Sequence, residues 1–280
     1  MKIAVTGATG FIGRHVLAEL ARHSVEVVAV VRDSSTVDVA PDVKTVKLDI
    51  SSCSPATTFD LLGRPDALIH LAWGGLPNYR SLHHFETELP LQYAFLSGLV
   101  RAGLPVLVAA GTCFEYGMRA GPLDESLDTH PDNPYGFAKD TLRRQLEYLR
   151  ISQPFAFTWA RLFYMYGPGQ ASNSLLPQLQ KAVERGDKVF NMSGGEQLRD
   201  YLPVTEIAKY FVMLALNKSD AGVLNICSGK PVSVRKLVEG WIEENGWKID
   251  LNLGHYPYPD YEPLAFWGDR RKLDLALAAL

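Results

Sequence analysis

Short apolar runs, many of them rich in β-branched residues, alternate along the first part of the chain with stretches of helical periodicity. Runs of this length are typical of buried strands. After the first run, Val16, Leu17 and Leu20 recur at the spacing of a helix face. The predicted strands cover residues 2–5, 25–31, 43–50, 66–73, 105–111 and 155–163, and the predicted helices cover about 80–102 and 135–151. Continuous apolar strands that alternate with helices predict a parallel sheet covered on both faces, which is a doubly wound α/β fold.

The texture of the sequence changes beyond about residue 165, where glycine, proline and aromatic residues become frequent. We predict a first domain over residues 1–165 and a smaller, mixed α/β lobe over residues 166–280. A helix at about 203–216 and a strand at 223–227 are expected to return to the first domain. The Pro- and Tyr-rich stretch 255–263 is predicted to form an ordered wall, because disordered segments contain few aromatic residues.

The composition is that of an ordinary globular protein, with 280 residues of which 47% are hydrophobic and 21% charged. A formal net charge of −3 argues against nucleic acid as a partner. The N-terminus lacks the apolar segment of a signal peptide, and no apolar run approaches the roughly 20 residues that cross a bilayer. Cys53, Cys113 and Cys227 form no CxxC pattern. We therefore expect no disulfide, no membrane partner and a cytoplasmic location.

Several common catalytic and metal-binding patterns are missing from the sequence. It contains no HExxH, no GxSxG and no complete P-loop. His83 and His84 are adjacent, and that spacing suits no common metal site on a helix. We therefore expect no bound metal ion.

A glycine-rich turn, TGATGFIG, directly follows the first predicted strand and precedes an amphipathic helix. Gly7 permits the tight turn, Gly10 lets the backbone approach a pyrophosphate, and Gly13 lets helix and strand pack closely. The N–H groups at the start of the helix would then face the phosphates. This context predicts a Rossmann domain that binds a dinucleotide.

The end of the second strand, VAVVRDSS, bears on the choice between NAD and NADP. An acidic residue here holds the ribose hydroxyls of NAD, but this chain has Arg32, whose guanidinium suits a 2′-phosphate. We therefore predict NADP, with Asp33 as the residue that would favour NAD instead. Asp49, at the end of the third strand, is a candidate partner of the adenine amino group. The carboxyl ends of the strands also place Ala72 and Thr112 along this edge.

Six motifs occur in the order found in the extended short-chain dehydrogenase/reductase family, in its epimerase/dehydratase branch. They are TGATGFIG, HLAW (70–73), GTCFEYG (111–117), YGFAK (135–139), RLFYMYGPGQ (161–170) and GEQLRDYLPV (195–204). The chain resembles this family over residues 1 to about 205. The resemblance implies a cofactor site formed by Gly7, Gly10, Phe11, Ile12, Gly13, Arg32, Asp49, Ile50, Leu71, Ala72, Trp73, Tyr135 and Lys139.

The family's catalytic set matches Thr112, Tyr135 and Lys139. Asn133 and Pro134 suit the N-cap and first position of a helix. Tyr135 and Lys139 then lie one turn apart on the same helix face. An isolated phenol has a pKa of about 10, so we expect the Lys139 ammonium and an oxidised nicotinamide to lower the pKa of Tyr135. Tyr135 would exchange a proton with a ketone as hydride moves, and Thr112 would bond the reacting oxygen.

Two departures from the family pattern limit the reactions that we expect. The family's dehydratases carry an Asp–Glu pair directly after the catalytic Thr, but this chain has Cys113 and Phe114 there. Glu115 is displaced by one position and is expected to face elsewhere. Loss of dehydration chemistry, together with Arg32, favours net reduction of a ketone by NADPH.

The resemblance implies a nucleotide-linked sugar as the substrate, most like the dTDP- or CDP-linked 4-keto-6-deoxysugars. Arg199 is the expected partner of the diphosphate, oriented by Asp200, and Arg270 is a second candidate. The expected substrate-binding residues are Thr112, Cys113, Phe114, Tyr164, Asn173, Leu175, Phe190, Arg199 and Arg270.

Two other functions remain open from the sequence. One is a C4 epimerase that retains tightly bound NAD, and the other is a non-catalytic dinucleotide sensor. The resemblance also implies a homodimer formed through the helices at about 80–102 and 135–151, although their apolar stripes serve equally well to cover the sheet.

Overall fold

The computed structural model describes residues 1–32, 43–51 and 55–279. Its centre is a seven-stranded sheet in which every neighbouring pair is parallel. The strands are β1 Lys2–Thr6, β2 Glu26–Val31, β3 Lys44–Lys47, β4 Ala67–His70, β5 Val106–Thr112, β7 Ala156–Leu162 and β11 Gly222–Ile226. Their order, β11-β7-β5-β4-β1-β2-β3, extends the order of a Rossmann sheet by one strand. The predicted doubly wound α/β fold is confirmed.

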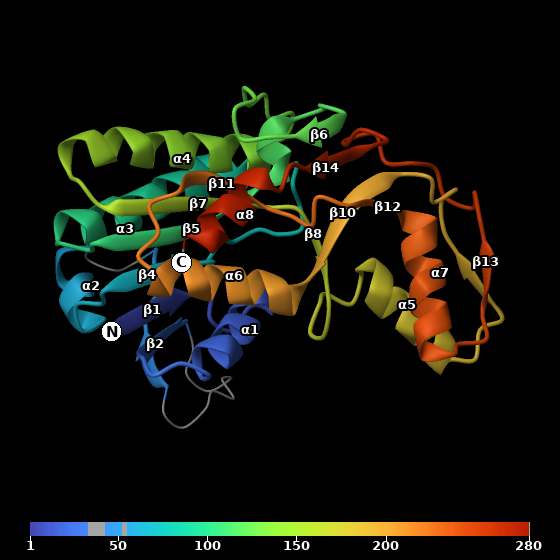
Figure 1. Cartoon of the computed structure of the whole chain (residues 1–280), viewed down its shortest axis with the longest axis horizontal. Helices are drawn as coiled ribbons and strands as arrows, with labels where there is room; N and C mark the ends of the chain where they lie inside the picture. The colour runs from blue at the N-terminus through green and yellow to red at the C-terminus, as the bar shows by residue number, and fades with distance from the viewer. Residues whose placement is uncertain (33–42, 52–54, 280) are drawn as a thin grey trace.

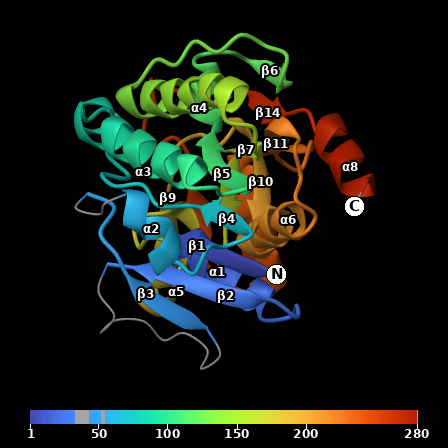
Figure 2. The same cartoon turned by 90° about the vertical axis from the view of Figure 1, so that its left-hand side faces the viewer.

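Helices cover both faces of this sheet (Figure 1). On one face lie α1 Phe11–Leu20 and α6 Val204–Leu216, and on the other lie α2 Pro55–Leu61, α3 Leu89–Arg101 and α4 Pro134–Ser152 (Figures 1 and 2). A short π-helical segment, η2 His84–Glu88, precedes α3. The strand alternation fixes this arrangement, since neighbouring residues of a strand point to opposite faces.

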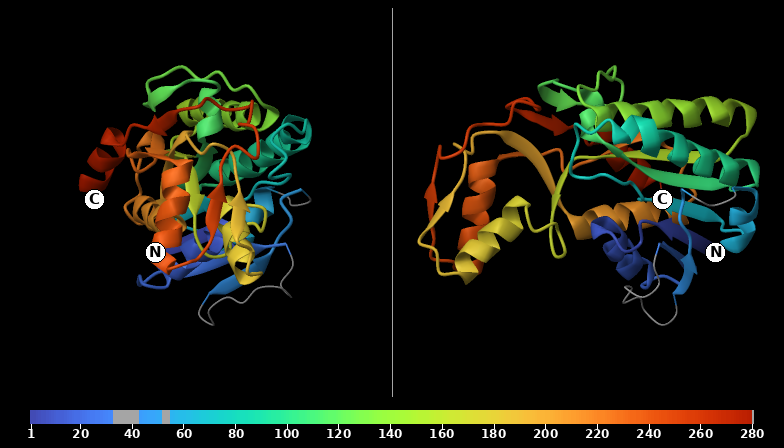
Figure 3. Two further views of the ribbon diagram at one scale, coloured as in Figure 1. Left: turned by 90° about the vertical axis from the view of Figure 1, so that its right-hand side faces the viewer. Right: turned by 180° about the vertical axis from the view of Figure 1, so that it is seen from behind.

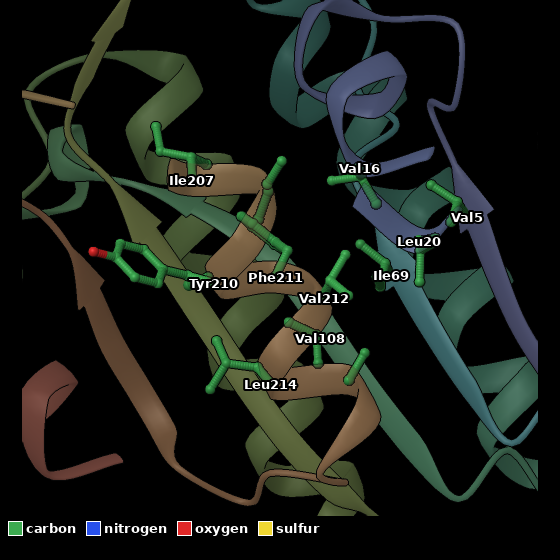
Figure 4. Close-up of a cluster of buried hydrophobic side chains, with 14 of the residues drawn as sticks. Val5, Val16, Leu20, Ile69, Val108, Ile207, Tyr210, Phe211, Val212 and Leu214 are labelled. Atoms are coloured by element: carbon green, nitrogen blue, oxygen red, sulfur yellow. The ribbon is translucent and has the colours of Figure 1, made fainter. Parts of the chain in front are cut away.

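The alternation is visible along β1, where each side chain enters one of two separate cores. Ile3 and Val5 pack with residues of α1 and α6, whereas Ala4 packs with residues of α3 and α4. Figure 4 shows the first of these cores, with Val16 and Leu20 of α1 facing Phe211 and Val212 of α6. The sheet is therefore buried on both faces, as its continuous apolar strands predict.

A smaller lobe extends from the end of the sheet (Figures 1 and 3). It contains α5 Leu175–Glu184, β9 Val189–Asn191, α7 Val234–Asn245 and β13 Asp250–Asn252, around an apolar core of its own. A sheet of β8 Tyr164–Tyr166, β10 Leu198–Pro203 and β12 Pro231–Ser233 leads into it. Two further strands, β6 Gly121–Leu123 and β14 Phe266–Gly268, pair beside the main sheet. The last helix, α8 Arg271–Ala278, buries Leu273 in the core shared by α1 and α6. The domain division at residue 165 stays a prediction.

The carboxyl ends of the parallel strands share one edge of the sheet, where the site residues are expected. The strand predicted at 66–73 ends earlier, at His70, because Leu71, Ala72 and Trp73 leave the sheet to line a cavity at this edge. None of the helices in the described ranges is long and apolar enough to cross a membrane. Within the same ranges, no group of three or more His, Cys, Asp or Glu side chains could hold a metal ion.

Candidate active site

The glycine turn forms a cradle that a larger residue would fill. Gly7 has a φ of +67°, and a Cβ atom there would lie 2.8 Å from the backbone nitrogen of Ala72. A Cβ at Gly13 would lie 2.1 Å from the carbonyl oxygen of Gly7. Gly10 is the N-cap residue of α1, so the first N–H groups of the helix are open to a ligand. These features fit the pyrophosphate of a dinucleotide.

A cavity of about 270 Å³ lies in front of this cradle. Most of the residues that we expected to bind the cofactor line it, together with Glu88 and Gln92 of the opposite wall. The lining contains Gly7, Gly10, Arg32, Asp49, Ile50, Leu71, Ala72 and Trp73. Phe11, Ile12 and Gly13 form the first turn of α1 behind the cradle. The residues present therefore fit a dinucleotide cofactor.

The far end of the cavity carries opposite charges. Arg32 is exposed directly after β2. The carboxylate of Asp49 accepts hydrogen bonds from the backbone nitrogen and the hydroxyl of Ser51, at 2.9 and 2.8 Å. These bonds, with a smaller contribution from Arg32, lower the pKa of Asp49. Asp33, the residue that would favour NAD, lies outside the described residues.

The predicted catalytic residues meet at the sheet edge. Thr112 is the last residue of β5, and Tyr135 and Lys139 lie in the first two turns of α4. The start of α4 is as predicted, because the Asn133 side chain accepts a hydrogen bond from Gly136 N at 2.9 Å and Pro134 is the first helical residue. Thr112, Tyr135 and Lys139 are at most 8% exposed.

The charges of this set differ from our expectation. Burial raises the pKa of the Tyr135 phenol well above its usual range, and nearby acidic groups raise it further. A hydrogen bond with the Thr112 side chain acts in the opposite direction. Lys139 is not among the main influences on the pKa of Tyr135, and burial lowers the pKa of Lys139 itself to about 7. The Lys139 Nζ atom donates to the carbonyl oxygen of Ala110 at 2.9 Å and lies 6.0 Å from the centre of the Tyr135 ring.

An aromatic wall surrounds Tyr135. The rings of Trp73, Tyr79, His84 and Phe114 lie 5.2 to 6.3 Å from its ring, centre to centre. Trp73 and Phe114 were predicted as site residues, whereas Tyr79 and His84 were not. The available signal was the aromatic- and His-rich stretch that follows HLAW, whose two histidines we considered only as metal ligands.

The positions after Thr112 are arranged as their residue types suggest. Cys113 is buried, and burial raises the pKa of its thiol. The Phe114 ring packs against Tyr79 at 4.9 Å. Glu115 turns into the core, as expected, and accepts hydrogen bonds from Thr112 N at 2.9 Å and Arg161 Nε at 2.6 Å.

Arg199 is buried, and the expectation that Asp200 orients it is wrong. The Asp200 carboxylate does not orient Arg199 but accepts from the backbone nitrogens of Ser228 and Gly229 at 2.7 and 2.9 Å. Arg199 instead pairs with Glu262, whose carboxylate also accepts from the hydroxyl of Tyr164. Glu262, which lies between Tyr261 and Pro263 in the stretch 255–263, was not among the predicted site residues.

The remaining predicted substrate residues are dispersed. Phe190 is buried in the core of the smaller lobe, and Leu175 packs against that core. Asn173 is exposed in the loop before α5. Arg270 donates to the Cys227 carbonyl at 3.1 Å, to the Tyr210 hydroxyl at 3.2 Å and to Asp274 at 2.7 Å. These contacts use its guanidinium to pack α8 against α6 and β11.

Known proteins are similar to this chain in sequence and fold over nearly its whole length. The model of the NAD dependent epimerase/dehydratase family matches residues 3–227. The dTDP-6-deoxy-L-talose 4-dehydrogenase (NAD(+)) of Aggregatibacter actinomycetemcomitans is 31% identical over 270 residues, which cover 96% of this chain and 99% of that protein. The dTDP-6-deoxy-L-talose 4-dehydrogenase (NAD(P)(+)) of Kitasatospora kifunensis is 29% identical over 92% of this chain and 83% of its own.

Solved structures of nucleotide-sugar enzymes also have a fold similar to that of this chain. MoeE5 in complex with UDP-glucuronic acid and NAD superimposes with a TM-score of 0.82 at 29% identity, over 99% of this chain and 93% of that one. A UDP-N-acetylglucosamine 4-epimerase from Methanobrevibacter ruminantium M1 shares the fold, with a TM-score of 0.87 at 23% identity over 98% of this chain and 91% of its own. The chain belongs to the NAD dependent epimerase/dehydratase family.

Proposed function

We propose that this protein is an NADP-dependent reductase of a nucleotide-linked 4-keto-6-deoxyhexose. One observation carries the proposal: Thr112, Tyr135 and Lys139 lie together at the edge of the sheet that carries the glycine cradle and its cavity. Two similar proteins are named as 4-dehydrogenases of dTDP-6-deoxy-L-talose, which is the same type of redox reaction in the opposite direction.

The site residues supply the proton chemistry of such a reduction. A bound nicotinamide supplies the hydride. Tyr135 donates its proton to the carbonyl oxygen at C4, and the Thr112 hydroxyl holds that oxygen by a hydrogen bond. The phenol carries its proton at neutral pH, as a proton donor requires, because its usual pKa of about 10 is raised further by burial. The Lys139 side chain holds the cofactor ribose.

The residues after Thr112 support reduction over dehydration. Removal of water from the sugar requires an acid–base group next to the catalytic Thr, but the Phe114 side chain there is an apolar ring in the wall around Tyr135. Glu115 is held in the core by Arg161 and Thr112 and does not serve this purpose. The aromatic wall also favours a sugar whose C6 is a methyl group, since apolar surface is best matched by apolar surface.

Three further features complete the proposal. Arg32 is exposed at the cavity, and a guanidinium there suits the 2′-phosphate of NADP. The smaller lobe, residues 166–280, binds the dTDP or CDP part of the substrate, with Arg199 near the diphosphate. Tyr148 and Ile151 on α4 are 75% and 79% exposed, and they suit a homodimer formed through α3 and α4. We expect the protein to act in the cytoplasm.

The proposal is tested by measuring oxidation of NADPH and NADH with a panel of dTDP-, CDP-, GDP- and UDP-linked 4-keto-6-deoxyhexoses. We expect turnover with the dTDP or CDP sugar, faster with NADPH, and a product reduced at C4. No turnover with any member of the panel would contradict the proposal.

A 4-epimerase is the second candidate, because related proteins of 23% to 26% identity are named UDP-glucose 4-epimerases. An epimerase recycles its cofactor within one catalytic cycle and therefore retains it. Purified protein that carries stoichiometric NAD and interconverts UDP-glucose and UDP-galactose without added cofactor would favour this candidate over the reductase.

A further inference from the structure

Trp73 and His84 lie outside the catalytic set but contact it on two sides. The indole of Trp73 lies 6.0 Å from the Tyr135 ring, and the His84 imidazole lies 5.2 Å from the same ring, centre to centre. Trp73 also lines the cofactor cavity. Neither residue has a role in the proton transfer described above, so their arrangement requires another explanation.

The hydrogen bonds of His84 fix its protonation state. Trp73 Nε1 lies 3.1 Å from His84 Nδ1, and because an indole nitrogen can only donate, Nδ1 must accept. The proton of the neutral ring is then on Nε2, which donates to the carbonyl oxygen of Asn78 at 2.9 Å. The His84 side chain is fully buried, and burial lowers its pKa. Both nitrogens of a neutral imidazole are therefore used to hold the indole in one orientation.

The orientation of the indole determines what Lys139 contacts. The Lys139 Nζ atom lies 3.9 Å from the centre of the Trp73 ring, well within the range of a cation–π interaction. Lys139 is only 3% exposed. Among the described residues, its one hydrogen-bond acceptor is the carbonyl oxygen of Ala110. The indole face thus provides the second contact for a buried ammonium, on the side of the cofactor cavity.

We propose that Trp73 and His84 form a positioning pair, in which the neutral imidazole of His84 holds the indole of Trp73 so that its face keeps the Lys139 ammonium beside Tyr135 and the cofactor. This inference rests on the proposed function, because it assigns Lys139 to the cofactor ribose and Tyr135 to proton transfer. His84 is a positioning residue and not a catalytic one, since its bonds go to Trp73 and Asn78.

Two substitutions of His84 separate its two hydrogen bonds. In His84→Asn the amide oxygen takes the approximate place of Nδ1 and can accept from Trp73. In His84→Gln the longer side chain reaches the place of Nε2 and can bond Asn78 but not Trp73. We expect His84→Asn to keep kcat within a factor of about three, and His84→Gln to lower kcat by roughly 10- to 100-fold, as misplaced catalytic groups do. The KM for the nucleotide sugar should change little in either variant.

Trp73→Phe tests the same pair from the other side, because it removes the N–H donor. We expect its kcat to fall as in His84→Gln, and the double variant to lose no more than either single variant, since one interaction is broken in each. His130→Gln, in an exposed loop, is the matched control. Equal losses in His84→Asn and His84→Gln, or additive losses in the double variant, would overturn the inference.

A readout that needs no sugar separates this inference from the proposed function. Fluorescence titration measures the affinity of each variant for NADPH. This affinity should fall in His84→Gln and Trp73→Phe and stay near the wild-type value in His84→Asn. If the variants bind NADPH in this pattern but the wild-type protein reduces no sugar of the panel, the proposed function fails and the positioning pair stands. If His84→Gln binds NADPH as tightly as His84→Asn, the positioning pair fails.

Discussion

The carboxylate of Glu262 lies 3.1 Å from the Nη2 atom of Arg199, and the two side chains are 10% and 2% exposed. Arg199 belongs to β10, whereas Glu262 comes from the stretch that leads into β14, so the pair ties this stretch to the strand that enters the smaller lobe. Arg199 also donates to the carbonyl oxygen of Leu264 at 3.0 Å, and its guanidinium lies 4.6 Å from the centre of the Phe266 ring.

Removal of one member of this pair should lower the free energy of unfolding more than removal of both members. Arg199→Met leaves the Glu262 carboxylate buried without its partner, and we expect the free energy of unfolding to fall by about 3–5 kcal/mol. The double variant Arg199→Met with Glu262→Met should lose less, because no charge is then stranded. Urea denaturation of the two single variants and the double variant measures this, and losses that simply add would show that the pair is not coupled.

Tyr135→Phe should abolish most turnover without loss of the fold. The variant keeps the aromatic ring within the wall of Trp73 and Phe114 but removes the proton that the reduction requires. We expect kcat to fall by about 10²- to 10⁴-fold, while NADPH binding changes little. Tyr148→Phe is the matched control, because Tyr148 is 75% exposed on α4. Full turnover in Tyr135→Phe would show that Tyr135 is not the proton donor, whereas full biological activity without turnover would favour the non-catalytic dinucleotide sensor.

Arg32→Ala should change the choice of cofactor. A hydrogen bond to a charged group contributes about 1.5–3 kcal/mol, so loss of the guanidinium should raise the KM for NADPH by roughly 10- to 100-fold and leave the KM for NADH almost unchanged. Arg22→Ala, in an exposed turn after α1, is the control. If the ratio of kcat/KM for the two cofactors is the same in Arg32→Ala as in the wild type, the preference for NADP is wrong.

Local patterns predicted much of the fold and part of the site. The apolar runs identified the strands of the parallel sheet, because most of these strands are buried on both faces by the helices that pack against them. The cradle at Gly7 and the cap at Asn133 were also predictable from the sequence, since a turn or a helix start depends on a few adjacent residues. Thr112, Tyr135 and Lys139 followed from motif order.

The unpredicted features depend on pairs that are distant in the chain. Glu262 meets Arg199 across 63 positions, and no local pattern shows which acid a buried guanidinium will select. The role of His84 depends on the orientation of Trp73, which only the packed structure shows. The pKa of Tyr135 rises because of burial, and a sequence gives the neighbours of a phenol in the chain but not its exposure to water.

His70 should make the stability of the protein depend on pH in the mildly acidic range. Its side chain is buried below the cofactor cavity, with Nδ1 2.8 Å from the hydroxyl of Thr6. Burial, with a smaller contribution from the charge of Lys139, lowers its pKa to about 3 from a usual value near 6.5. Between these two values the unfolded chain binds a proton at His70 and the native protein does not.

The free energy of unfolding should therefore fall as the pH is lowered below 6.5, by about 1.4 kcal/mol for each unit, with no contribution from His70 at higher pH. His70→Asn keeps a polar partner for Thr6 but does not titrate, so its unfolding free energy should vary less between pH 6.5 and 5, a window above the usual range of carboxylates. Urea denaturation at several pH values measures both slopes, and His130→Asn, in an exposed loop, should retain the wild-type slope. Equal slopes in the wild type and His70→Asn would mean that His70 binds its proton in the native protein, and the lowered pKa would then be wrong.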